Sequence, residues 1–400
     1  MDVNSDKVEL TPREYAQSTA KAWRRKAQIF KIYVSLLLVF TGTLNTLLAR
    51  WDNTVVAVGA KGTNPKPEHP FVHPYVRTLS MFAAEASCLI VFKLLYYYHK
   101  KVKKTDLVTR FGKQDFSIFV FLFPAICDML ATSTLYIGLQ LTYTSSYQVL
   151  QGARLIFTAF LSVAFLGSKV PIYYWTGVIS VVIGLAVVSL GDMVSDDSNS
   201  ADFDSLITGN ILIVASQAIN SIQFVMEQKL LQGYNIPPLQ AVGWEGVFGF
   251  CILGVAVVPM YLIPWHLPAG PDFWQDHARF EDIVDAVNQL LYIPSLAIAF
   301  VSVNISIAFF NFASLSVTKL EDAITRTVID SLRAVILWII GLAFKWQYFE
   351  YFQPVGYSIV VIGMCVFCNI IFSWVMKKLG IWPACCGNSY DDDDDELVQH

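Results

Sequence analysis

Apolar residues in this chain gather into ten long runs separated by short polar segments. Each run approaches the roughly 20 apolar residues that a helix needs to cross a bilayer. The pattern therefore predicts an all-α membrane protein with ten transmembrane helices. The expected helices cover residues 29–49, 77–97, 116–138, 144–166, 171–190, 207–229, 241–263, 291–313, 323–344 and 354–374.

The composition agrees with this interpretation. The 400 residues are 55% hydrophobic and only 15% charged, whereas soluble domains carry about 25% charged residues. Disordered chains have the opposite bias, with low hydrophobicity and high net charge. The composition therefore excludes a soluble or disordered protein and makes the lipid bilayer the expected environment.

The distribution of Lys and Arg predicts the orientation. Ten crossings place both termini on one side, and the loops on that side hold seventeen Lys and Arg residues against six on the other. Because positive charge favours the cytosolic side, we expect both termini to be cytosolic. The segment 191–206 is then an acidic lumenal loop, 1–28 a cytosolic segment and 375–400 a cytosolic acidic tail.

The chain contains an internal repeat with a shift of 179 residues. Under this shift Gly177 and Gly184 fall on Gly356 and Gly363, and Arg154 falls on Arg333. The expected halves, 29–190 and 207–374, have five helices each, so the second half enters the membrane from the opposite side. Such inverted-topology repeats are typical of secondary transporters.

Charged residues within the predicted helices indicate a central polar site. Arg326, Asp330 and Arg333 share one helical face, and the inverted repeat brings Arg154 and Arg333 together near the midplane. These four residues sum to two positive charges, which suits an anion; the alternative is a structural ion-pair network. The candidate substrate-binding residues are Tyr147, Gln148, Gln151, Arg154, Thr158, Asn220, Gln223, Asn304, Asn311, Arg326, Asp330 and Arg333.

Two carboxylates lie well inside predicted helices. Asp128 and Glu85 are candidates for carrying a coupling proton, because intramembrane ionisable residues usually serve function. Glu227 and Glu245 lie close to predicted helix ends, so we expect them to be solvated near the cytosolic interface. Glycines at 177/184, 356/363 and 246/249/254 indicate close helix contacts.

No pattern for covalent catalysis or metal binding is present. The sequence has no His-Glu-x-x-His, no Gly-x-Ser-x-Gly and no Gly-Lys-Ser/Thr phosphate loop. We expect no enzyme activity, cofactor, metal or nucleic-acid partner. A homodimer is left open.

Several motifs resemble the F subfamily of solute carrier family 35, in the drug/metabolite transporter superfamily, which includes the nucleotide-sugar transporters. They include Thr41-Gly-Thr-Leu-Asn-Thr46, Cys127-Asp-Met129 and Asp330-Ser-Leu-Arg333. The resemblance covers about residues 29–374 and implies a multi-pass transporter of lysosomal or other endomembranes, without naming a substrate. The family usually has Arg where this chain has Gln151, and an aliphatic residue where it has Arg154, which implies that the charge has moved by one helical turn.

These observations predict a secondary-active transporter of a small polar, anionic solute that works by alternating access and is coupled to protons. One alternative is an organic-cation transporter that uses Glu85, Asp128 and Glu227. The other is a non-transporting membrane scaffold that retains the transporter fold.

Overall fold

The structure is a computed structural model of the chain. It describes residues 12–58, 68–71, 73–103, 116–141, 144–168, 171–195, 203–262, 281–345 and 351–367. The predicted acidic tail 375–400 and much of the predicted lumenal loop 191–206 lie outside these residues.

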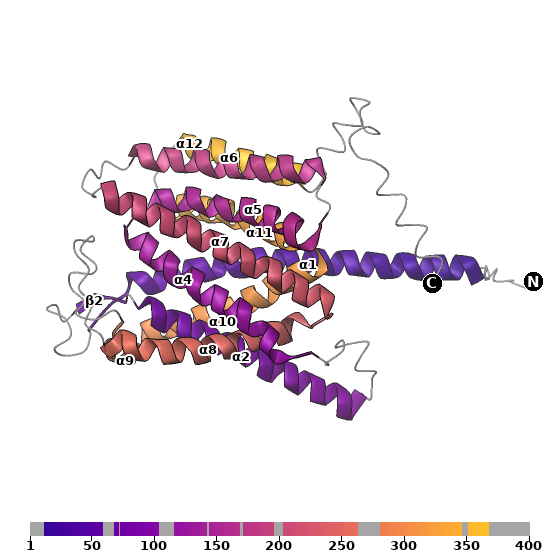
Figure 1. Ribbon diagram of the computed structural model, residues 1–400, viewed down its shortest axis with the longest axis horizontal. Helices are drawn as coiled ribbons and strands as arrows, with labels where there is room; N and C mark the ends of the chain where they lie inside the picture. The colour runs from indigo at the N-terminus through magenta and orange to yellow at the C-terminus, as the bar shows by residue number, and fades with distance from the viewer. Residues whose placement is uncertain are drawn as a thin grey trace, which may run out of the picture.

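Nearly all of the described chain is helical (Figure 1). The α-helices are α1 (Pro12–Thr54), α2 (Pro74–Tyr98), α4 (Leu122–Leu141), α5 (Thr144–Leu166), α6 (Ile172–Ser195), α7 (Phe203–Gly233), α8 (Pro238–Leu262), α9 (Ile283–Tyr292), α10 (Pro294–Leu320), α11 (Ala323–Ala343) and α12 (Phe352–Phe367). A π-helical turn, η1 (His99–Lys103), follows α2, and a 3-10 turn, η2 (Ile118–Phe121), precedes α4.

Helix ends follow from local side-chain chemistry. The carboxylate of Asp322 accepts a hydrogen bond from the backbone N–H of Thr325 at 2.6 Å and starts α11. Pro74 and Pro294 begin α2 and α10, where a missing N–H costs nothing. Gly167, with φ of +63°, ends α5 in the left-handed conformation that glycine adopts without strain.

Two helix pairs form opposite edges of the bundle. Helices α6 and α12 lie side by side at one edge, and α2 and α8 at the other (Figure 1). Between them, α4 packs on α7, α1 on α10 and α5 on α7. Helix α11 contacts α1 and α5, so the charged faces of α5, α7 and α11 meet in the centre.

Glycines allow the edge pairs to approach closely, as the sequence predicted for Gly177/Gly184, Gly356/Gly363 and Gly246/Gly249. The same prediction for Gly254 was wrong, because a Cβ there would meet only Leu79 Cδ1, at 3.9 Å. A Cβ atom on Gly184 would lie 2.7 Å from the carbonyl oxygen of Gly356, and one on Gly177 would lie 2.8 Å from the backbone of Phe367. On the other edge, Gly243 and Gly246 press against the α2 backbone in the same way.

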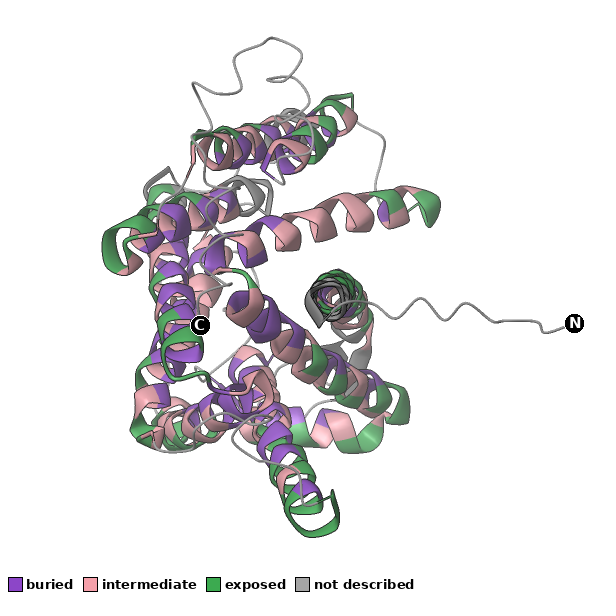
Figure 2. Cartoon of the chain, turned by 90° about the vertical axis from the view of Figure 1, so that its right-hand side faces the viewer, coloured by how far each residue is buried: buried purple, intermediate pink, exposed green. Residues whose placement is uncertain are grey.

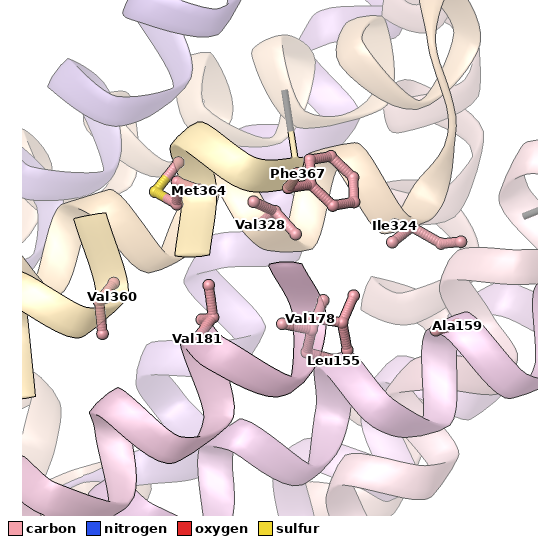
Figure 3. Close-up of a cluster of buried hydrophobic side chains, with 9 residues drawn as sticks. All are labelled: Leu155, Ala159, Val178, Val181, Ile324, Val328, Val360, Met364 and Phe367. Atoms are coloured by element: carbon pink, nitrogen blue, oxygen red, sulfur yellow. The ribbon is translucent and has the colours of Figure 1, made fainter. Parts of the chain in front are cut away.

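An apolar cluster joins α5, α6, α11 and α12 beside the α6–α12 pair. Figure 3 shows side chains from these four helices facing one another. Leu155 and Ala159 come from α5, Val360 and Phe367 from α12, and all are buried. The cluster fixes α5 and α11 relative to one edge and so positions the arginines that they carry.

The outer surface is apolar, as a bilayer environment requires. Large side chains such as Phe40, Leu94 and Val255 are exposed, and exposed positions lie along the outer sides and ends of the helices (Figure 2). Among the described residues, six helices are long and apolar enough to cross a membrane, and three shorter apolar segments lie in α5, α6 and α12. Helix α11 carries three charged residues, Arg326, Asp330 and Arg333.

One end of the bundle has structure that the apolar pattern did not predict. Val56–Val58 and Glu68–Pro70 form a two-stranded antiparallel ribbon, and α9 contacts its first strand. The apolar pattern predicted no helix between residues 263 and 291, but Ile283–Tyr292 forms the amphipathic helix α9. Its start is capped by Asp282, whose carboxylate accepts from Asp285 N–H at 3.0 Å.

A buried ion-pair cluster ties this end together. His73 Nδ1 lies 2.8 Å from Glu281 Oε1, and His73 Nε2 lies 3.2 Å from Asp285 Oδ2. The other Glu281 oxygen accepts from the N–H of Tyr75 at 2.9 Å. Burial lowers the pKa of His73, but the two carboxylates outweigh it and raise that pKa to about 9. The imidazolium therefore fastens the start of α2 to α9.

Candidate functional site

The two arginines related by the internal repeat meet on one carboxylate. Arg154 of α5 donates from Nη2 to Asp330 Oδ2 at 3.1 Å, and Arg333 of α11 donates from Nη2 to the same oxygen at 3.4 Å. The expectation that Arg154 and Arg333 would face each other is therefore confirmed. Two guanidinium groups share one carboxylate, which leaves one net positive charge.

A cavity of about 360 Å³ opens beside this pair. We call it the arginine cavity. Its polar and aromatic walls are Thr46, Gln151, Arg154, Thr327, Asp330, Ser331, Arg333, Trp338 and Tyr357. The Trp338 and Tyr357 rings lie 5.0 Å apart, and the Trp338 indole N–H donates to Gln353 Oε1 at 2.8 Å. The cavity thus combines positive charge with rigid aromatic surface and side-chain oxygens.

A second cavity, of about 200 Å³, is lined by four carboxyl side chains and two arginines. We call it the acidic cavity. Its polar and aromatic walls are Glu85, Asp128, Thr132, Arg154, Asn220, Gln223, Phe224, Glu227, Glu245, Phe310, Asn311 and Arg326. Helices α2, α4, α5, α7, α8, α10 and α11 all contribute to it. Arg154 lines both cavities.

Of the two arginines that share a helical face with Asp330, Arg326 pairs with a different carboxylate. Its Nη1 donates to Glu227 Oε2 at 2.5 Å, and its guanidinium carbon lies 3.7 Å from the centre of the Phe224 ring. Glu227 also accepts from the Gln223 amide at 2.8 Å. Because Glu227 neutralises Arg326, the expected surplus of two positive charges falls to one.

The prediction that Glu227 and Glu245 would be solvated was wrong. Glu227 is 1% exposed and Glu245 is 8% exposed. Helix α7 continues to Gly233, beyond the end predicted at residue 229, so Glu227 lies farther inside than expected. Glu245 lies in the first half of α8, which packs closely on α2.

The two candidates for proton coupling both line the acidic cavity. The Glu85 carboxylate accepts from the Asn311 amide, and Glu85 is buried. Asp128 accepts from the Thr132 hydroxyl at 3.5 Å. Asn220, Gln223, Arg154 and Arg326 also line this cavity, so seven of the predicted residues, from six helices, lie around one space.

Other predicted residues lie elsewhere. Thr158 is fully buried and donates to Ser221 at 3.1 Å, so it links α5 to α7. The Asn304 amide donates to the Phe300 carbonyl of its own helix at 2.8 Å. Neither residue lines either cavity. Tyr147 and Gln148 belong to α5, but their side chains are outside the described part of the chain.

Sequence reasoning missed the aromatic walls and the fourth carboxylate. Trp338 and Tyr357 are uncharged and lie in two apolar helices, so the search for buried charges did not detect them. Their contact joins α11 to α12. Glu245 did carry a signal, since it is a lone carboxylate at the start of an apolar run. Because Glu245 lies only four residues from the predicted helix start at residue 241, its burial was not expected.

Comparisons with known proteins support a transporter. Residues 26–256 match the nucleotide-sugar transporter family. The chain is 40% identical to human solute carrier family 35 member F6 over 346 residues, which cover 86% of this chain and 90% of that protein. The mouse protein of the same name is 39% identical over 86% of this chain and 89% of its own length.

Two weaker similarities also cover most of the chain. An uncharacterised protein of Schizosaccharomyces pombe is 26% identical over 84% of this chain and 97% of its own length. A solved crystal structure with 12% sequence identity superposes with a TM-score of 0.56 over 84% of this chain and 95% of that one, which shows similarity of fold alone. The chain therefore belongs to the nucleotide-sugar transporter family, within solute carrier family 35, and is a multi-pass membrane transporter and not an enzyme.

Proposed function

We propose that this protein is a secondary-active transporter of a small polar solute that carries negative charge. The observation that carries this proposal is the sharing of one Asp330 oxygen by Arg154 and Arg333. One net positive charge then borders a cavity of about 360 Å³, within the range of roughly 300–1,000 Å³ common for small-molecule sites. An arginine pair also matches the geometry of carboxylate and phosphate groups.

The fold that goes with this function is ten helices in two inverted halves, 29–190 and 207–374. The packing pairs support this arrangement: α4 on α7 is mirrored by α10 on α1, and α4 on α8 by α10 on α2. The pairs α6–α12 and α2–α8 are each formed by corresponding helices of the two halves. In such transporters, substrate sites lie between the repeats near the bilayer midplane.

Rocking of the two halves would expose the site to each side in turn. Asp128 and Glu85 would carry a coupling proton, since both line the acidic cavity. We place both termini in the cytosol and the protein in a lysosomal or other endomembrane, on the basis of the Lys and Arg distribution and the family.

The acidic cavity favours a second candidate, transport of organic cations. Four carboxylates line that cavity, and among them Glu227 is already paired with Arg326. Under this alternative, the ligand would be held by Glu85, Asp128 and Glu245 in place of the arginines. A scaffold without transport would need neither cavity.

Thermal stability of the detergent-purified full chain tests these candidates. The panel contains nucleotide sugars, nucleotides, carboxylates, amino acids and organic cations, each with wild type and with Arg333→Ala. A ligand at about a hundredfold excess over its Kd stabilises by about 2.7 kcal/mol. We expect an anionic compound to raise the Tm of wild type and not of Arg333→Ala.

Arg333→Ala is a suitable probe because Arg154 keeps its own bond to Asp330. Arg25→Ala, at an exposed position, is the matched control and should retain the response. Stabilisation by cations alone would replace the proposal with the second candidate. No response from a folded protein to any compound would favour the scaffold.

A further inference from the structure

The two cavities are neighbouring parts of one polar region. Arg154 bonds Asp330 in the arginine cavity and lines the acidic cavity, where its guanidinium carbon lies 5.8 Å from the Phe224 ring centre. Phe310 lines the acidic cavity, and its ring centre lies 5.5 Å from the Arg333 guanidinium carbon. Arg154 and Phe310 therefore lie at the boundary between the arginine cavity, which is the positive end of the region, and the acidic cavity, which is the negative end.

The negative end has more carboxylates than cations. Arg326 is bonded to Glu227, and Arg154 is bonded to Asp330. Glu85, Asp128 and Glu245 have no Lys, Arg or His ion-pair partner within the described residues. Carboxylates in a low-dielectric site are costly unless positive charge or protons compensate them.

Two buried oxygens in the acidic cavity lack a hydrogen-bond donor. Oε1 of Glu245 and Oε1 of Gln223 are fully shielded and have no hydrogen-bond partner in the described part of the chain. Both side chains are more than nine-tenths buried and line the acidic cavity. Both atoms are acceptors, so the group that would complete the site is a donor.

The arrangement fits an ammonium group better than a metal ion. No three His, Cys, Asp or Glu side chains among the described residues lie close enough together to hold a metal. An ammonium group instead offers three N–H donors, which is the kind of group that the unbonded oxygens of Glu245 and Gln223 require. The rings of Phe224 and Phe310 add aromatic surface, which attracts organic cations.

We infer that the two cavities form one composite site for a zwitterionic solute. Its anionic group binds beside Arg154 and Arg333, and its protonated amine binds in the acidic cavity, where Glu245 is the recognition residue. This inference rests on the proposed transport of a negatively charged solute and narrows its chemical class. A zwitterion would bind in both cavities, whereas a simple anion would bind only in the arginine cavity and a simple cation only in the acidic cavity.

A ladder of ω-amino acids from glycine to 6-aminohexanoate tests the inference, because each member separates the two charges by a different length. For each length, the carboxylate and the amine with the same carbon chain are the single-charge controls. Tm is measured with increasing ligand for the detergent-purified full chain, and for Glu245→Gln and Arg333→Ala. Glu321→Gln removes a carboxylate from an exposed position and is the matched control for Glu245→Gln.

We expect one ω-amino acid of the series to raise the Tm of wild type at about a tenfold lower concentration than the carboxylate or the amine of the same length. The reason is that hydrogen bonds between charged groups are strong. Glu245→Gln should lose that tenfold advantage and keep its response to the carboxylate. Arg333→Ala should lose the response to both. Glu321→Gln should behave as wild type.

Three results would overturn the assignment. If the carboxylate and the amino acid stabilise equally and Glu245→Gln has no effect, the zwitterion is wrong and anion transport stands. If the amine alone stabilises, both the zwitterion and the anion proposals fail. If no member of the ladder shifts the Tm of the folded protein, the composite site does not recognise this class.

Discussion

The two edge pairs, α6–α12 and α2–α8, use the same packing device but differ in what they bury. In each, glycines bring one helix backbone against the other: Gly184 meets Gly356, and Gly246 meets the Ala86 backbone. The α6–α12 contact adjoins an apolar cluster. The α2–α8 contact carries Glu85 and Glu245, which turn towards the acidic cavity.

This difference distinguishes residues that only hold two helices together from residues that also serve a function. Close glycine contacts stabilise helix pairs in membranes through packing and need no charge, as α6–α12 illustrates. Buried carboxylates weaken a helix pair unless a partner or a ligand compensates them. Their presence on α2–α8 therefore fits the proposal that this edge also contributes to a ligand site. Variants at equivalent glycines and at nearby charges can test that distinction.

The largest expected effect is loss of either pair through a bulky side chain. We expect Gly184→Leu and Gly246→Leu each to destabilise the protein by about 3 kcal/mol or more, because a Cβ at either position would collide with backbone atoms. Yield of monodisperse protein and Tm in detergent measure the effect. If the two edges differ only in their charges, both variants should lose yield and Tm to a similar degree.

Gly254→Leu is the control within the same helix. A Cβ on Gly254 would meet only Leu79 Cδ1, at 3.9 Å, an ordinary contact. We expect it to fold with near-normal Tm. Equal damage from Gly254→Leu and Gly246→Leu would mean that helix flexibility, and not close approach, explains the glycines.

A smaller effect, with a pH signature, is expected at the charged end of α2. The pKa of His73 is raised to about 9 in the folded protein, from about 6.5 when unfolded. Its contribution is thus fully present below about pH 6.5 and is lost as the pH rises through about 9. At 1.36 kcal/mol per pKa unit, it amounts to about 3 kcal/mol.

We expect His73→Gln to lower the Tm most below about pH 6.5, with the difference from wild type vanishing above about pH 9. Gln353→Leu, at a buried polar residue on α12 that bonds Trp338, is the comparison at the other edge and should give a loss that does not vary with pH. A constant loss for His73→Gln across the pH range would rule out the charged cluster as its cause.

The sequence predicted the helices well because the signal is local. The apolar run 144–166 became α5, Thr144–Leu166, and 323–344 became α11, Ala323–Ala343. The glycines at 177/184 and 356/363 predicted close helix contacts without naming the partner helix, and the internal repeat predicted the meeting of Arg154 with Arg333. Helix α9 was missed because its ten residues are shorter than a span and follow an acidic segment.

The ion-pair partners were harder to predict, because they depend on which helices meet. Asp330 lies within one turn of both Arg326 and Arg333, so spacing alone cannot choose between them. Contact between α7 and α11 supplies Glu227 to Arg326, which leaves Asp330 to Arg333 and Arg154. The helix ends predicted from the apolar pattern likewise placed Glu227 and Glu245 closer to solvent than they are.

The smallest expected effect sharpens the comparison within α8. Gly254→Ala adds a Cβ where only Leu79 lies within 4 Å, and it removes the extra backbone freedom that glycine has when unfolded. We therefore expect a gain of up to about 1 kcal/mol, seen as a slightly higher Tm.

Gly246→Ala, eight residues earlier on the same helix, should instead lower the Tm, because its Cβ would collide with the Ala86 backbone nitrogen. Opposite signs for one substitution on one helix would show that proximity to α2, and not helix propensity, selects glycine at Gly246. A higher Tm for both variants would mean that Gly246 does not touch α2, which would also remove the close contact that holds Glu85 and Glu245 beside the acidic cavity.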